Sequence, residues 1–522
     1  MSVKYAILNA LMWATMLAFP LQCVIDPSSE NIVAAAIVAL SGLSVLAYIK
    51  WGTVADDQPL ATIALLGFCV TSQLGALLVQ TGFWTPLRLS LYNPLYTFSH
   101  LAFYQAIALV MLVVYRFFQV PGPQRVGVVR GLLSWAGSYR APSSQVVWFM
   151  GLVGLASFIA SAHEGVAARI AGGFNFLAWG PFLLPIFARE IGPSYGNARR
   201  NNFFLAIYTM MVVFVGIGLN VRVIMFIGLV TVGLLYLLIG LRSRRELHSD
   251  SLTRIGVVAL ILLALSGPLS DLATSMAIAR GARGHVSPVE MIKKTFAVWR
   301  RPSLIAEYRR ETSAVARFAA YDEHYVANPI LARFVETKFH DNQFHFASLL
   351  TTQASKDQLR AVTIDAIWAI LPTPILKTLG VAVDKADIDF SIGDYMAYLS
   401  RGVTLGGRKT GSMFAQGEVI LGPLFPIVYA VSCLFLYALM NLLTFRRPSG
   451  IAELSPLAMM TLWSFFYRGI TSDAVNNSLV FIFRNFLQTI VVYTMIFCLA
   501  RLLFGFVFRQ RTSMSLGLPQ AT

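Results

Sequence analysis

Long apolar stretches recur along most of this chain and are separated by short polar loops. A run of about 20 apolar residues is long enough to cross a bilayer as an α-helix. The pattern predicts twelve membrane spans, which we place at residues 4–24, 31–49, 59–82, 95–117, 145–162, 170–188, 203–220, 222–241, 254–270, 417–443, 455–468 and 480–507. We therefore expect an all-α, polytopic integral membrane protein, and not an outer-membrane barrel, whose strands would alternate apolar and polar residues.

One polar segment, residues 271–416, interrupts the series between the ninth and tenth spans. Within it, Ser287 to Glu290 has the pattern of a helix capping box with Pro288 at the first helical position. Amphipathic helical spacing continues beyond this box and recurs at 304–318, 331–339 and 358–370. Because a structureless loop of this length is improbable, we expect a small helical lid on the outer membrane face, or helices in the headgroup layer.

The chain accordingly divides into residues 1–270 with nine spans, the insert at 271–416, and residues 417–522 with three spans and a tail. We expect these parts to form one integrated membrane domain. The first apolar run, 6–21, lacks a clear small-residue cleavage site and is followed by another apolar run, so we expect a retained helix and not a signal peptide.

Composition and charge agree with this class and give an orientation. Of the 522 residues, 57% are hydrophobic and only 13% are charged, whereas soluble domains carry about 25% charged residues. Basic residues in the short loops cluster after even-numbered spans, at Lys50, Arg116, Arg125, Arg130, Arg140, Arg189, Arg199, Arg200, Arg242, Arg244, Arg245, Arg446, Arg447, Arg501, Arg509 and Arg511. The positive-inside rule then places these loops and both termini in the cytoplasm and the insert outside.

The formal net charge of +16 follows largely from this topology and from contact with anionic lipid. No basic stripe interleaved with aromatic residues appears in a soluble segment, so nucleic acid is not an expected partner. The four cysteines lie in or beside apolar runs and suggest neither a disulfide framework nor a zinc site.

Ionisable residues inside apolar spans are costly, so their positions indicate function. Here they gather toward the predicted outer ends of the spans, at Arg222, Glu418, Arg468 and Arg484. A guanidinium group suits phosphate because its fork donates two parallel hydrogen bonds and stays protonated. We therefore expect a lipid phosphate or diphosphate ligand at the outer headgroup level. The alternative is that these arginines contact ordinary headgroups.

The glycine-rich stretch 402–410 lacks the spacing of a nucleotide-binding phosphate loop, because Arg408 separates Gly407 from Lys409. Arg401, Arg408 and Lys409 remain candidates for binding an anionic part of a substrate.

Two further patterns in the insert bear on chemistry. Asp387 and Asp389 form a DxD pair, which binds a divalent ion in some sugar-transfer enzymes but also occurs by chance. A histidine is the usual general base near neutral pH, and the insert offers His285, His324, His340 and His345.

Two stretches resemble bacterial oligosaccharide repeat unit polymerases of the Wzy type. Gly216–Arg222, followed by the apolar span Val223–Leu241, is similar to the family's pattern of glycine and arginine before an apolar helix. The second stretch is similar to the family's proline-rich insert end and glycine-and-glutamate entry into the next helix, at Ala369–Pro374, Gly411-Ser412, Gly417-Glu418 and Gly422. The topology, with spans on both sides of one large outer insert, agrees with that family and with the O-antigen ligases.

The resemblance implies an inverting glycosyltransferase of the GT-C type in the bacterial inner membrane. Its donor would be a glycan on undecaprenyl diphosphate, its acceptor a second lipid-linked repeat unit, and its product O-antigen, capsule or exopolysaccharide. Arg222 and Arg468, supported by Arg484, would stabilise the leaving diphosphate. Glu418 or His340 would be the general base.

The resemblance also bears on cofactors and partners. Metal-dependent members of the wider class keep acidic residues in a long first outer loop, whereas here that loop is only about 26–30, which favours a metal-independent reaction without a cofactor. Membrane lipids and a chain-length regulator are the further partners that it suggests.

Two alternatives stay open. A ligase would transfer finished glycan to another lipid, and a transporter would move a polysaccharide or lipid without forming a bond. A transporter should show an internal repeat with interrupted spans in matching positions, and a carrier would more often place ionisable groups at mid-depth beside broken helices.

Overall fold

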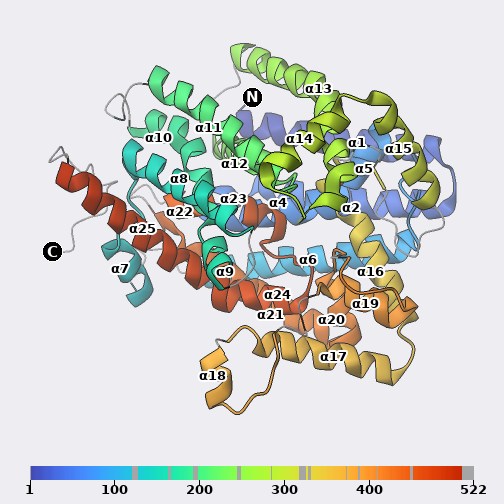
Figure 1. Ribbon diagram of the computed structural model, residues 1–522. Coiled ribbons are helices and arrows are strands. Elements are labelled where there is room, and N and C mark those ends of the chain that lie inside the picture. The colour runs from blue at the N-terminus through green and yellow to red at the C-terminus, as the bar shows by residue number, and fades with distance from the viewer. Residues whose placement is uncertain are drawn as a thin grey trace.

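The computed structural model describes residues 2–119, 127–162, 166–191, 195, 198–243, 249–283, 285–316, 325–326, 328, 331–371, 373–385, 388, 390–407, 409–446 and 451–507 (Figure 1). These residues form helices almost throughout, which confirms the all-α prediction. In the described ranges the only sheet is a two-stranded antiparallel hairpin of β1 (Thr444–Arg446) and β2 (Ala452–Leu454).

The first part of the chain contains the helices before the insert. They are α1 (Val3–Ile25), α2 (Ser29–Trp51), α3 (Val54–Asp57), α4 (Pro59–Cys69), the π-helical turn η1 (Val70–Leu74), α5 (Gly75–Gly82), α6 (Pro94–Phe118), α7 (Val128–Trp135), α8 (Ser144–Ala160), α9 (Val166–Gly172), the 3-10 helix η2 (Asn175–Leu183), α10 (Leu184–Ile191), α11 (Ala198–Gly218), α12 (Ile224–Arg242) and α13 (Ser249–Ile278).

The insert and the last part are also helical. The insert holds η4 (Ala279–Ala282), α14 (Pro288–Trp299), α15 (Pro302–Ala316), η5 (Leu331–Arg333), α16 (Thr337–Leu349), α17 (Gln353–Trp368), α18 (Thr373–Thr378) and α19 (Ile392–Arg401). After it come α20 (Met413–Leu421), η6 (Gly422–Leu424), α21 (Phe425–Leu442), α22 (Pro456–Met460), α23 (Leu462–Arg468), α24 (Val475–Val480), the π-helical turn η7 (Phe481–Asn485) and α25 (Phe486–Val507).

Within the described residues, nine helical stretches are long and apolar enough to cross a membrane. They are Val3–Ile25, Ser29–Trp51, Pro59–Gly82, Pro94–Phe118, Ile170–Arg189, Ala198–Gly218, Ile224–Arg242, Met413–Leu442 and Val475–Phe504. A multi-pass membrane protein follows from these helices. The predicted span 145–162 corresponds to the shorter helix α8, and 254–270 lies in α13, where the side chains of 249–263 fall outside the described part. The number of crossings therefore stays a prediction.

Several predicted spans are interrupted. The stretch 170–188 is divided among α9, η2 and α10, with Pro181 inside the 3-10 helix. The stretch 455–468 is two short helices, α22 and α23, instead of one span. The third and twelfth spans each contain a π-helical turn, a feature that is frequent at functional sites.

The predicted span 417–443 is not one straight helix either. Gly422 has a φ of +54°, and the chain bends back there. The Phe414 ring of α20 lies 5.4 Å from the Tyr429 ring of α21. In a continuous helix these residues would be roughly 22 Å apart along the axis. The span is therefore α21 alone, and α20 folds back beside it.

The third span is the most buried element of the membrane part, because every residue of α4 is shielded from solvent. Helix α23 packs against it so closely that a Cβ atom added to Gly67 would lie 1.7 Å from the Phe466 carbonyl oxygen. Only glycine allows this approach.

The helices of the insert pack in two groups. Helices α14 and α15 contact α13, and α14 also contacts α11, whereas α16 and α17 contact α20. The N-cap half of the predicted capping box is present, since Ser287 Oγ accepts a hydrogen bond of 3.2 Å from the Glu290 N–H. The predicted segment 331–339 is broken, because η5 ends at Arg333 and α16 begins only at Thr337.

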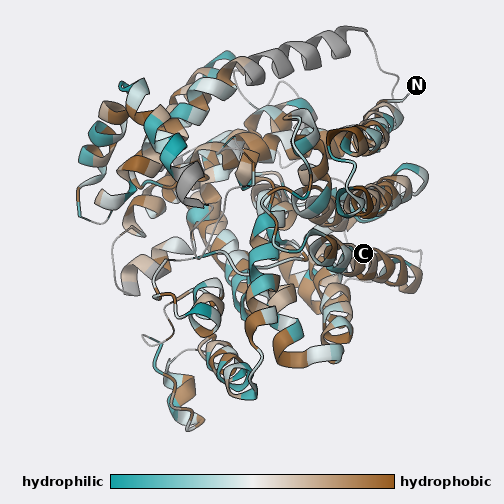
Figure 2. Cartoon of the chain, turned by 90° about the vertical axis from the view of Figure 1, so that its right-hand side faces the viewer, coloured by the Kyte–Doolittle hydropathy of each residue, from teal (hydrophilic) through white to brown (hydrophobic). Residues whose placement is uncertain are grey.

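Helix α16 is hydrophilic in sequence and yet almost entirely buried from Thr337 to Phe344. Figure 2 shows hydrophilic helix turns in the middle of the molecule, between mostly hydrophobic helices. The π-helical turn of the third span contributes to this arrangement, because Thr71 O accepts from the Glu336 N–H at 2.7 Å and Ser72 O accepts from the Thr337 hydroxyl at 2.8 Å. The insert is thus more than a lid, since one of its helices reaches the middle of the third span.

Candidate functional site

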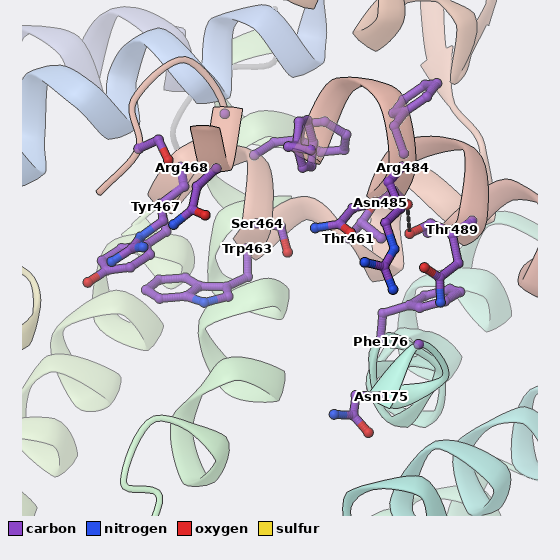
Figure 3. A pocket seen from close by; sticks show the side chains of 18 of the residues that line it. Asn175, Phe176, Thr461, Trp463, Ser464, Tyr467, Arg468, Arg484, Asn485 and Thr489 are labelled. Carbon is purple, nitrogen blue, oxygen red and sulfur yellow. Dashed lines mark hydrogen bonds between the residues drawn. The ribbon is translucent and has the colours of Figure 1, made fainter. Parts of the chain in front are cut away.

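A cavity of about 740 Å³ lies between interrupted helices in the described part of the chain. Its walls come from η2, from α23 and the connector after it, and from η7 with the start of α25. Figure 3 shows Trp463, Tyr467 and Arg468 on one side and Arg484 on the other. Two of the predicted diphosphate-binding arginines therefore share one cavity.

Arg468 ends α23 and is held by two carboxylates. Its Nη1 atom lies 2.6 Å from Asp473 Oδ2, and its Nη2 atom lies 4.0 Å from Glu336 Oε1. The guanidinium group also lies over the Tyr467 ring, which stacks on Trp463 with ring centroids 4.9 Å apart. The Arg468 side chain is still 33% exposed, and it lines the cavity.

Arg484 lies in the π-helical turn η7 and is exposed. In the part of the chain that the structure describes, its guanidinium group has no hydrogen bond and no ion pair. Asn485, Gln488 and Thr489 follow it on the same wall of the cavity. An unpaired cation beside polar side chains in a membrane protein favours an anionic ligand.

A second cavity of about 320 Å³ adjoins the first and shares Ile227, Trp463 and Tyr467 with it. Arg222, Arg280, Arg283 and Arg333 line it, together with apolar side chains. The third predicted arginine, Arg222, is thus on the other side of the Trp463–Tyr467 pair from Arg484. The sequence analysis did not predict Arg280, Arg283 and Arg333 as site residues. Nothing in the sequence distinguishes them from the other basic residues of the insert.

The turn that carries Arg222 depends on Asn220. This residue has a φ of +51°, which asparagine tolerates better than most residues. Its side-chain amide donates to Met276 O at 3.0 Å, which joins the turn between α11 and α12 to the end of α13. The asparagine therefore fixes the turn, and Arg222 follows two residues later.

Arginine is the commonest charged residue in the described walls of the two cavities. Six arginines line them, namely Arg222, Arg280, Arg283, Arg333, Arg468 and Arg484. The only acidic residue that lines either cavity among the described residues is Asp473, and it is paired with Arg468.

Glu336 and His340 of the insert line a small cavity of about 10 Å³, which Arg468 also lines. The His340 Nδ1 atom lies 2.8 Å from Ser412 Oγ, and its Nε2 atom is buried without a partner among the described residues. Burial, and then the charge of Arg468, lower the pKa of His340 to about 3, so the ring is neutral near pH 7.

The two carboxyl groups next to Arg468 differ in their environment. Burial raises the pKa of Glu336 by more than Arg468 lowers it. Burial also acts to raise the pKa of Asp473, but Arg468 and Asn477 hold it below the usual value. Glu336 was missed in the sequence, since nothing in its neighbourhood indicates burial. Asp473, which follows the eleventh predicted span, reaches the large cavity, with 27% of its side chain exposed.

Asp341 fixes α16 in place. It is fully buried and accepts hydrogen bonds from the backbone N–H groups of Tyr92 and Asn93, from the Thr97 hydroxyl and from Lys338. A buried carboxylate with four donors is well compensated, so this group positions the helix that carries His340.

The structure places Glu418 away from the arginines. Its carboxylate accepts from Tyr96 and Tyr104 at 3.1 and 2.7 Å and lies 2.7 Å from His100 Nδ1. It lines neither arginine cavity. These contacts make Glu418 a link between α20 and α6.

The candidates around the glycine-rich stretch also lie apart from the two cavities. Lys409 Nζ is 3.1 Å from the buried carboxylate of Asp394. Arg401 lies 2.6 Å from His345 Nε2 and over the ring of Tyr92.

Some predicted positions fall outside the described residues. They are Arg408, His324, Asp387 and Asp389. Among the residues that are described, no group of three or more His, Cys, Asp or Glu side chains could hold a metal ion.

No protein-family model, no curated protein and no solved structure matches this chain. Its function must therefore be argued from the site alone.

Proposed function

We propose that this protein is a glycosyltransferase that polymerises oligosaccharide units carried on undecaprenyl diphosphate, at the outer face of a bacterial inner membrane. The observation that carries the proposal is the pair of adjoining cavities, which six arginines and one acid line among the residues that the structure describes. Such a site suits diphosphate, because guanidinium groups donate parallel hydrogen bonds to phosphate oxygens. Apolar side chains in the same walls suit a lipid chain.

The reaction would use these residues as follows. A hydroxyl of the acceptor sugar attacks the anomeric carbon of the donor, and the bond from that carbon to the diphosphate oxygen breaks. The electron pair goes to the diphosphate, whose growing charge Arg468 and Arg484 stabilise. Arg222 and its neighbours would hold the diphosphate of the second lipid, with Trp463 and Tyr467 between the two carriers.

The hydroxyl proton needs an acceptor, and Asp473 is the carboxylate that lines the large cavity. At rest Arg468 lowers its basicity. A diphosphate that draws Arg468 away would raise the pKa of Asp473 and so activate it. His340 stays a second candidate, because its Nε2 atom has no partner among the described residues and the residue lines the small cavity that Arg468 also lines. Glu418 has no part in this scheme.

Activity can be measured in liposomes that contain the purified protein and lipid-linked oligosaccharides extracted from cells that lack it. The wild type should convert single units into a ladder of longer glycans on a gel. R468Q and R484Q should each lower the rate about a hundred-fold, the loss typical of one transition-state donor.

R88Q is the matched control, because Arg88 lines neither cavity and is paired with Asp26 at 2.5 Å. It should keep nearly full activity. Equal rates for R484Q and the wild type, or the absence of any new glycosidic bond, would refute the proposal. A ligase would instead attach the glycan only to a different lipid acceptor.

Transport is a second candidate, because one observation favours it. The large cavity is bordered by interrupted helices, and Glu336 contacts the third span at Thr71, roughly 16 Å along the helix axis from Gly82. Charged groups at such depth beside broken helices are typical of carriers. The liposome assay separates the two, since a transporter moves its substrate across the bilayer with unchanged mass.

A further inference from the structure

The insert contains a segment whose exposed surface is unusual for a water-soluble lid. In α17 the exposed side chains change from polar to apolar along the helix, from Asp357 and Arg360 to Ile364 and Trp368. Ile375 and Leu379, in and just after α18, continue the apolar surface. These four large apolar side chains are between 39% and 56% exposed.

Hydrogen bonds define the direction in which α17 runs. Arg360 donates to Ile420 O at 3.0 and 3.2 Å, and Gln416 donates to Thr363 Oγ1 at 2.8 Å. As the residue number rises along α17 it falls along α20, so the two helices are antiparallel. Figure 1 shows α17 beneath α20 and α24 at the edge of the molecule, with α18 beyond the end of α17.

The position of α20 then gives the depth of α17. The Phe414 ring at the start of α20 stacks on Tyr104, with centroids 4.6 Å apart. Tyr104 lies ten residues into α6, or roughly 15 Å along the axis from its beginning at Pro94. Because Thr363 bonds to Gln416, two residues after Phe414, the second half of α17 lies at the depth of the membrane-spanning part of α6 and not above it.

We propose that residues 361–371 and 373–383 belong to a re-entrant element whose apolar face contacts the acyl chains of the outer lipid leaflet. Its surroundings support lipid as the occupant, because Leu424, Ile427 and Val431 expose a comparable apolar face on the neighbouring span. The segment carries only two ionisable residues, Asp365 and Lys377, and a lysine stem can extend its charge to the headgroups. The element would also support the site, since Val362 and Ala366 line a small cavity with Asp473.

The proposal is independent of the polymerase reaction and can be tested by spin labelling in liposomes of phosphatidylcholine and phosphatidylglycerol. Single cysteines replace Ile364, Ile375 or Leu379, with Asp357 as the control position. Cys23 and Cys498 are changed to alanine, whereas Cys69 and Cys433 are buried and remain. Labels at the three apolar positions should collide more often with oxygen than with a water-soluble nickel chelate, and the label at 357 should do the reverse.

Two results would overturn the proposal. One is nickel accessibility at 364, 375 and 379 equal to that at 357, which would place the segment in water. The other is dipolar broadening at 375 that persists when the protein is diluted with lipid, which would identify a second copy of the chain as the occupant. Both readouts require only folded protein in a bilayer, so they stand whether or not the chain polymerises glycans.

Discussion

Arg468 and Arg484 line one cavity but differ in what compensates their charge. Arg468 has Asp473 at 2.6 Å and Glu336 at 4.0 Å, whereas Arg484 has neither an ion pair nor a hydrogen bond among the described residues. A ligand anion at Arg484 would find an uncompensated cation, and at Arg468 it would compete with Asp473. The same diphosphate would thereby release a carboxylate, which links binding to the activation of a base.

Glu336 is expected to lower stability near neutral pH, because the effect of burial on its carboxylate outweighs its contacts with Arg468 and Tyr467. Its raised pKa means that the folded chain holds this proton more tightly than the unfolded chain. The contribution of the protonated group is present at low pH and is lost as the pH rises through the folded pKa.

E336Q keeps the shape and removes the charge. We expect it to raise the free energy of unfolding at about pH 8 by on the order of 1 kcal/mol, with the gain shrinking as the pH falls toward about 4. Thermal unfolding in detergent at several pH values measures this difference. E290Q, whose carboxylate is half exposed, should show no such trend. A gain that grows on acidification would contradict the assignment.

At the scale of elements, regular spans could be predicted and interruptions could not. The runs that became α1, α2, α6, α11 and α12 are apolar over a bilayer's thickness, and hydropathy alone identifies them. The bend at Gly422 and the break between α22 and α23 leave hydropathy unchanged, since both sides remain apolar. Such breaks depend on tertiary contacts, such as Phe414 against Tyr429.

Some residues of the candidate site could likewise be predicted from the sequence, and others could not. Arg468 and Arg484 stand out because charge is rare in apolar runs. Glu336 does not, because it lies in a polar segment whose burial depends on partners far away in the chain, such as Thr71. His340 was a candidate as a histidine, but its burial beside Ser412 could not be predicted. Glu418 stood out equally well, yet its contacts are with Tyr96, His100 and Tyr104, so rarity indicates a role without specifying which.

The close packing of α4 against α23 should tolerate no side chain at Gly67. G67A would place a methyl group 1.7 Å from the Phe466 carbonyl oxygen, so the two helices must separate. We expect a loss of about 1–3 kcal/mol in the free energy of unfolding, the usual cost of overpacking.

The control is G233A in α12, where an added Cβ meets nothing within 4 Å. Alanine favours the helix by up to about 1 kcal/mol there, so stability should stay equal or rise. Melting temperatures of the two variants in one detergent test this, and similar losses for both would show that the contact with α23 is not the cause.

For the whole molecule, the decisive question is which side of the membrane the insert faces. The positive-inside rule predicts from the basic loops that the insert lies outside, and the proposed reaction requires that side. T351C tests the insert and V128C the opposite side, since both positions are exposed. In a background without Cys23 and Cys498, a membrane-impermeant maleimide should label T351C in intact spheroplasts and V128C only after permeabilisation. Labelling of V128C alone in intact spheroplasts would place the arginine cavities in the cytoplasmic half of the bilayer. Polymerisation at the outer face would then be impossible, whereas the transport candidate would remain.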